Sequence, residues 1–147
     1  MGTLREPPRK RSEAELATYG MVDEYLARFG EAVEAQFDAL DRDGYTDLRY
    51  GQLVIGVNVV PSRGVLLLLV RMGELPATDC SELLHTLLEL NFLATGECAF
   101  AIDEAKEAVY LRAMRRLEGL DYAEFEGLLQ TVATVAEDMS SRLRAAL

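Results

Sequence analysis

The sequence predicts an α+β domain in which helices pack against a twisted antiparallel sheet, in the order α-β-β-β-α-β-β-α. Three observations lead to this prediction. Apolar residues recur at spacings of three and four in three long segments, which is typical of amphipathic helices. Between these segments lie short runs that are continuously apolar or alternate apolar with polar residues, which is typical of strands. The strands are separated by short turn sequences, which favours antiparallel hairpins.

Composition and charge narrow the class of protein. The 147 residues suit one domain, and half of them are hydrophobic. Residues 1–11 carry a net charge of +3 and residues 12–147 carry −13, which together give the total of −10. We therefore expect a flexible basic arm over residues 1–11 and a single globular domain over residues 12–147. Because the domain is strongly acidic, we expect no nucleic-acid partner and no stable membrane insertion.

The first helix is predicted to begin at Ser12, which forms an S-x-x-E capping box with Glu15. Its apolar stripe repeats at spacings of three and four and comprises Leu16, Tyr19, Val22, Leu26, Phe29, Val33, Phe37 and Leu40. Gly20 and Gly30 are the positions where this helix is expected to bend or break.

Three strands are predicted next, near residues 46–50, 53–60 and 65–71. The preceding segment DRDGYTD resembles a calcium-binding loop. Counted from Asp41, however, its fifth and sixth positions are Tyr45 and Thr46, where a calcium loop needs an oxygen ligand and a glycine. We therefore interpret the segment as a turn.

The third strand carries six aliphatic residues in a row, from Val65 to Val70. The run is too short for a membrane span, so we interpret it as a strand that is buried on both faces. Leaving Leu66, Leu68 and Val70 in water would forgo about 2 kcal/mol for each side chain. Together with Val54 and Val60 from the mixed face of the preceding strand, these three residues are expected to contact a partner. The pattern alone leaves open which face belongs to the core.

The second helix is predicted to start from a cap at Thr78 or Asp79 and to end near Ala94, before Gly96. Its apolar residues cover more than half of its circumference, whereas one core needs a narrower stripe. This indicates that the helix buries a second face. Asn91 lies in the apolar arc and is expected to hydrogen-bond a neighbouring turn.

A hairpin and a last helix complete the predicted order. In the hairpin, Cys98, Phe100 and Ile102 alternate with more polar neighbours, and Val109 to Met114 alternate in the same way. The last helix begins with a D-x-x-E pattern at Asp121 and Glu124.

Catalytic machinery is not evident. His85 is the only histidine, the phosphate-binding glycine motifs do not occur, and Cys80 and Cys98 are isolated. We expect two free thiols, no cofactor, no metal site and no enzyme activity. An enzyme would need a pocket that holds a carboxylate or cysteine with a strongly shifted pKa, for which the surroundings of Cys80 and Cys98 are the candidates.

The chain resembles the type III secretion chaperone family (CesT/Tir chaperone-like). The resemblance rests on LLHTLLELNFL, on the hairpin GECAFAIDEAKEAVYLRAMRRL, on the last helix LDYAEFEGLLQTVATVAEDMSSRL, and on the upstream strand VLLLLVRMGELP. Met139 departs from the family pattern, because many relatives carry tryptophan there. The YbjN-like family, whose members are cytoplasmic regulatory or accessory proteins, has a similar fold and is the alternative.

The first resemblance implies a non-catalytic cytoplasmic chaperone. It implies a homodimer whose interface includes Leu84, Leu87, Leu88 and Phe92 of the second helix. It also implies that the dimer binds an extended N-terminal segment of a secreted effector and keeps it competent for export, through apolar patches and strand addition.

Overall fold

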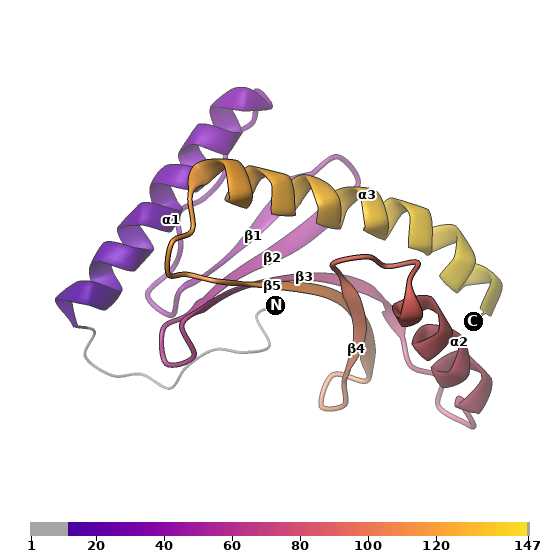
Figure 1. Cartoon of the computed structure of the whole chain (residues 1–147). Coiled ribbons are helices and arrows are strands. Elements are labelled where there is room, and N and C mark those ends of the chain that lie inside the picture. Colours follow the sequence, from indigo (N-terminus) through magenta and orange to yellow (C-terminus); the bar gives the residue numbers. More distant parts are fainter. Residues whose placement is uncertain (1–11, 147) are drawn as a thin grey trace.

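The computed structural model describes residues 12–146, which fold in the predicted order α-β-β-β-α-β-β-α (Figure 1). The elements are α1 (Glu13–Ala32), β1 (Tyr45–Tyr50), β2 (Leu53–Val60), β3 (Val65–Glu74), α2 (Ser81–Phe92), β4 (Ala99–Asp103), β5 (Ala108–Arg116) and α3 (Tyr122–Ala146). The predicted arm over residues 1–11 lies outside the described residues.

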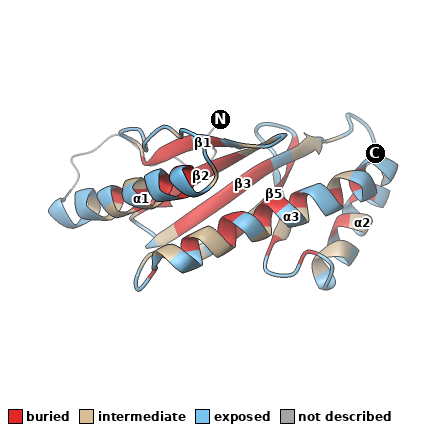
Figure 2. Cartoon of the chain, turned by 90° about the horizontal axis from the view of Figure 1, so that it is seen from above, coloured by how far each residue is buried: buried red, intermediate tan, exposed pale blue. Residues whose placement is uncertain are grey.

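The five strands form one antiparallel sheet in the order β1-β2-β3-β5-β4. Helices α1 and α3 both lie on one side of this sheet, and α2 lies at the end nearest β4 (Figures 1 and 2). We call the side under α1 and α3 the helix face, and the opposite side the open face, because none of the described helices covers it.

The main core lies between the helix face and the helices. Strands β2, β3 and β5 contribute alternate side chains to it, in the register that pairs Val57 with Leu68 and Leu68 with Ala113. Leu129, Val132 and Ala136 of α3 belong to the same core. The alternation of apolar residues predicted from the sequence is therefore confirmed for these strands.

Helix α1 begins with the predicted capping box, in which the Ser12 hydroxyl accepts from the Glu15 N–H and the Glu15 carboxylate accepts from the Ser12 N–H. It ends at Ala32, although the helical spacing continues to Leu40. The helix stops because Glu34 adopts the left-handed backbone conformation (φ 55°) and the Ala35 N–H turns back to donate to the Gly30 carbonyl at 2.9 Å. Gly30 leaves room for this turn, since a Cβ atom there would stand 2.7 Å from the Ala35 carbonyl oxygen. Beyond the turn, Phe37 reaches the core from irregular backbone and stacks on Phe29.

Helix α3 starts with the predicted D-x-x-E motif, because the Asp121 carboxylate accepts from the Glu124 N–H at 2.8 Å and Glu124 accepts in return from Asp121. It is tied to α1 by Tyr25, whose hydroxyl donates to the Leu120 carbonyl and whose ring contacts Phe125. Helix α2 lacks the predicted side-chain cap, since Asp79 instead accepts from the N–H and hydroxyl of Ser81.

Asn91 joins the end of α2 to β4. Its side-chain oxygen accepts from the Phe100 N–H at 2.7 Å, and its amide group donates to the Phe100 carbonyl at 3.3 Å. Because β4 is an edge strand, these Phe100 groups point away from β5, toward the side where the sheet ends. Asn91 therefore has a structural role, although its partner is a strand rather than the expected turn.

Candidate partner-binding surfaces

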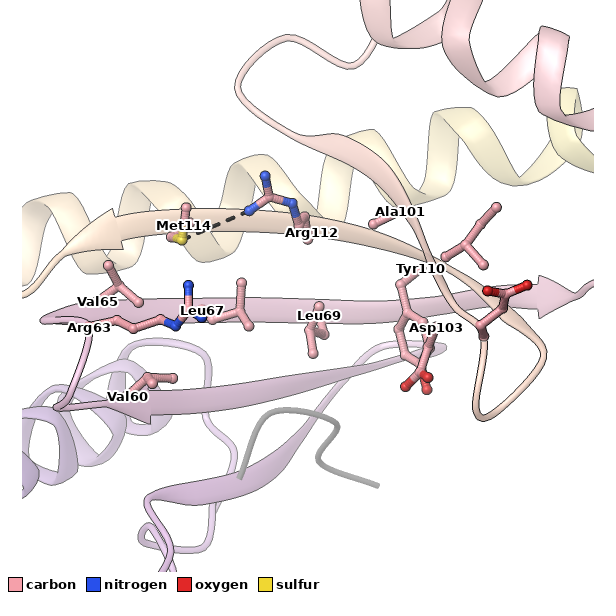
Figure 3. A pocket seen from close by; sticks show the side chains of 12 residues that line it. Val60, Arg63, Val65, Leu67, Leu69, Ala101, Asp103, Tyr110, Arg112 and Met114 are labelled. Carbon is pink, nitrogen blue, oxygen red and sulfur yellow. Dashed lines mark hydrogen bonds between the residues drawn. The ribbon is translucent and has the colours of Figure 1, made fainter. Parts of the chain in front are cut away.

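The open face carries an apolar groove between β2, β3, β4 and β5 (Figure 3). Leu67 and Leu69 form its floor, and with Tyr110 and Ala108 they make an apolar cluster separate from the main core. The groove has a volume of about 570 Å³. Its full lining is Val60, Arg63, Val65, Leu67, Leu69, Ala101, Ile102, Asp103, Glu104, Tyr110, Arg112 and Met114.

The residues expected to contact a partner fall on two different faces. Val54 and Val60 lie on the open face, where Val60 lines the groove and Val54 lines a smaller neighbouring cavity. Leu66, Leu68 and Val70 lie on the helix face, where they are buried in the main core. The expectation that these three residues contact a partner is therefore wrong, because the helices of the same chain already cover them.

The groove therefore uses the other half of the apolar run, with Leu67 and Leu69, which had not been among the residues expected to contact a partner. Leu67 stands opposite Asn58 on β2 and opposite Met114 on β5, and Leu69 stands opposite Arg112. Asn58, Arg112 and Met114 all belong to the mixed faces of their strands. The signal was thus present in the sequence, but it needed the register between strands that are distant along the chain.

A polar cluster adjoins the groove at the middle of the open face. The Tyr45 hydroxyl donates to Asp47, and its ring lies over Gly56, where a Cβ atom would come within 2.9 Å of the hydroxyl oxygen. Arg71 lies beside Tyr110 and hydrogen-bonds it, while burial raises the pKa of the Tyr110 hydroxyl above its ordinary value. The phenol therefore stays neutral at physiological pH and can donate a hydrogen bond.

Helix α2 presents a second apolar surface. Of the four residues expected at a dimer interface, Leu84, Leu88 and Phe92 are exposed, whereas Leu87 is buried in the main core together with Leu83. Leu87 is therefore corrected from an interface residue to a core residue. Leu93 is exposed beside Phe92 and was missed because the apolar arc runs around most of the helix. We call Leu84, Leu88, Phe92 and Leu93 the α2 patch.

The two cysteines are free, and Cys80 is half-buried. Cys98 is buried, and burial together with the neighbouring Glu97 carboxylate raises the pKa of its thiol to about 11. A nucleophilic thiol needs the opposite shift. Within residues 12–146, no group of three or more histidine, cysteine or acidic side chains could hold a metal ion.

Membrane crossing is likewise not indicated by the helices. Among the described helices, none is long and apolar enough to span a bilayer.

Solved structures with a similar fold are complexes of two proteins. A chain of the ExsC-ExsE complex has a TM-score of 0.70 and 22% sequence identity, and the match covers 85% of this chain and 95% of that one. For the HopA1-SchA chaperone-effector complex the TM-score is 0.67 and the identity 14%, with 86% and 97% covered. For the heterodimeric ExoU-SpcU complex from the type III secretion system of Pseudomonas aeruginosa, the TM-score is 0.60 and the identity 22%, with 86% and 98% covered.

Sequence comparison gives the family directly. No curated protein sequence matches the chain significantly. The model of the Tir chaperone protein (CesT) family matches residues 24–140, which is most of the 147-residue chain and includes both apolar surfaces. The match thus favours the first of the two families that the sequence resembles. The chain therefore belongs to the Tir chaperone protein (CesT) family of type III secretion chaperones.

Proposed function

We propose that this protein is a non-catalytic cytoplasmic chaperone that acts as a homodimer and binds an extended N-terminal segment of a secreted effector, keeping it competent for export. The family match supports an effector-binding role, and one compared complex is a chaperone bound to its effector. The observation that carries the proposal is the apolar groove on a sheet face that none of the described helices covers.

The groove suits an unfolded ligand better than a folded one. It runs along strands whose side chains repeat every two residues, so an extended segment can place alternate side chains on the floor made by Leu67 and Leu69. Met114 is 49% exposed at the groove wall and offers a flexible apolar contact that adapts to different side chains. A bound extended segment would cover Leu67, Leu69 and Met114, and such binding requires no catalytic group.

The α2 patch supports the homodimer. Leu88 and Phe92 are large apolar side chains on one side of a helix whose other side is already packed on the core. A second copy of the chain offers a matching apolar surface, as symmetric dimers require. The groove and the α2 patch share no residue, so a second copy of the chain and an effector segment can use separate surfaces.

The test is to isolate the tagged protein from its source cells and to identify the proteins that co-purify by mass spectrometry. We expect one dominant secreted partner whose N-terminal segment resists proteolysis in the complex. Met114→Glu should lose this partner, because it places a charge on the groove wall. Thr134→Glu, which adds the same charge at an exposed position of α3, should retain it.

Two results would count against the proposal. One is a dominant partner that is not secreted, which would favour an accessory role like that of YbjN-like proteins. The other is a secreted partner whose binding Met114→Glu leaves unchanged, which would place the binding surface outside the groove.

A further inference from the structure

The groove on the open face carries opposite charges at its two ends (Figure 3). Arg63 precedes β3 at one end, and Arg112 projects from β5 closer to the middle. Asp103, at the end of β4, and Glu104, in the following turn, line the other end. Between the two ends the floor is apolar.

The basic groups of the groove are not neutralised within the described chain. Neither Arg63 nor Arg112 forms an ion pair with a carboxylate of residues 12–146, and the Arg112 guanidinium only contacts the Met114 sulfur at 3.9 Å. Arg71, another cation of the open face, differs from them because it lies 3.9 Å from the Glu74 carboxylate and hydrogen-bonds Tyr110.

The strand register shows why the two ends do not neutralise each other. Arg112 pairs with Ala99, and Asp103 pairs with Ala108, so the two charged residues stand four positions apart along β5. At about 3.4 Å per residue this is about 14 Å, several times the length of an ion pair. The two ends therefore do not pair with each other, and the Asp103 carboxylate, which accepts a hydrogen bond from the Lys106 N–H at 3.3 Å, forms no ion pair with Arg112.

The length of the ligand follows from the same register. Arg63 lies two residues before Val65, which pairs with Arg116, so the whole groove extends along the nine residues from Ala108 to Arg116. An extended segment covers this in roughly five residues from Arg112 or nine from Arg63.

We propose that the groove selects an extended segment with a carboxylate at one end, a cation at the other, and apolar side chains at alternate positions between them. This rests on the proposed function, since it specifies the segment that the chaperone would bind. Arg63 and Arg112 would bind the carboxylate of the segment, and Asp103 and Glu104 would bind its cation. The net charge of −13 over residues 12–147 repels a uniformly acidic segment, and a uniformly basic one leaves the two arginines unpaired.

The test uses three synthetic nine-residue peptides that share a core of alternating valine and serine. One has aspartate at one end and lysine at the other, one has aspartate at both ends, and one has lysine at both ends. We expect the mixed peptide to bind about fivefold tighter than either other peptide in fluorescence anisotropy at low salt. This comparison does not depend on the direction in which a peptide lies.

Charge reversal gives the decisive variant. In Arg63→Glu/Arg112→Glu both ends of the groove become acidic, so the peptide with two lysines should become the preferred ligand. A gain of binding cannot come from unfolding. The matched control is Arg42→Glu/Arg144→Glu, which makes the same change of net charge at exposed positions outside the groove and the α2 patch and should keep the preference for the mixed peptide.

Four results would overturn the proposal, and they differ in what they leave standing. Equal binding of all three peptides would leave a groove that binds extended chains without charge selection. Binding of none would remove the groove, and with it the proposed function, from this face. If the peptides bind equally to a variant that lacks residues 1–11 but do not bind to the full chain, the natural ligand of the groove would be residues 1–11 of the chain itself. If adding a peptide converts a dimer of the protein into a monomer, the groove would instead bind a second copy of the chain.

Discussion

Replacing Leu88 by glutamate should dissociate the proposed homodimer without unfolding the protein. Leu88 is 71% exposed, and its neighbours Phe92 and Leu93 in the α2 patch are 90% and 79% exposed. At about 2 kcal/mol for a fully buried side chain, covering these three residues yields about 5 kcal/mol per protomer and about 10 kcal/mol per dimer. Association itself costs on the order of 4–15 kcal/mol, so the net free energy of dimerisation from these side chains is close to zero.

A dimer so near balance is sensitive to a single residue. Leu88 occurs twice in a symmetric interface, and its exposed fraction makes each copy worth about 1.4 kcal/mol. Removing both copies should therefore raise the dissociation constant of the dimer about a hundredfold. The glutamate adds the cost of removing a charge from water, so this value is a lower bound.

The assay is sedimentation velocity over about three decades of protein concentration, with circular dichroism to confirm that each variant is folded. We expect a dimer for the wild type and a monomer for Leu88→Glu at the same concentrations. Thr134→Glu, which adds an equal charge to α3, should remain a dimer. A dimer of unchanged affinity in Leu88→Glu would place the interface elsewhere, and a monomeric wild type would refute the homodimer.

Three further predictions follow from burial, hydrogen bonding and ionisation. Leu68→Ala should lower the free energy of unfolding in urea by about 3 kcal/mol, whereas Met114→Ala should cost less than about 1 kcal/mol; the reverse order would place Leu68 outside the core. Asn91→Ala should cost about 1–2 kcal/mol and speed hydrogen exchange at the Phe100 amide, and unchanged exchange would show that this amide has another partner. Burial raises the pKa of the Cys98 thiol from 9.0 to about 11. The thiol ionises at lower pH in the unfolded state, so the free energy of unfolding falls as pH rises from about 9 to 11. The stability advantage of the wild type over Cys98→Ala should therefore shrink between about pH 8 and about pH 10.5, and a constant difference would contradict the raised pKa.

Much of the fold was predictable because it rests on local patterns. The capping motifs at Ser12 and Asp121 and the alternation in each strand are encoded within a few residues, so their elements were predicted in the correct order. The end of α1 was harder to predict. The helical spacing continues past Ala32, and only the left-handed backbone at Glu34, with the Ala35 N–H turned back onto the Gly30 carbonyl, shows why the helix stops.

The candidate surfaces were less predictable because their residues look alike in the sequence. Both faces of β3 are apolar, so choosing between Leu67 and Leu68 requires knowing which side the helices cover. The same holds for Leu87 and Leu88 on α2, which are adjacent and chemically identical. Their roles are set by long-range packing, on which hydrophobic periodicity carries no information.

The bonds between Asn91 and Phe100 have a consequence for how the protein behaves at high concentration. An edge strand with free N–H and C=O groups invites another strand to pair with it, and repeated pairing leads to fibrils. At Phe100 an incoming strand would have to break two existing hydrogen bonds before forming its own, so the exchange gains nothing there. At Phe100 these bonds therefore oppose pairing of β4 with a β4 strand from another copy of the chain.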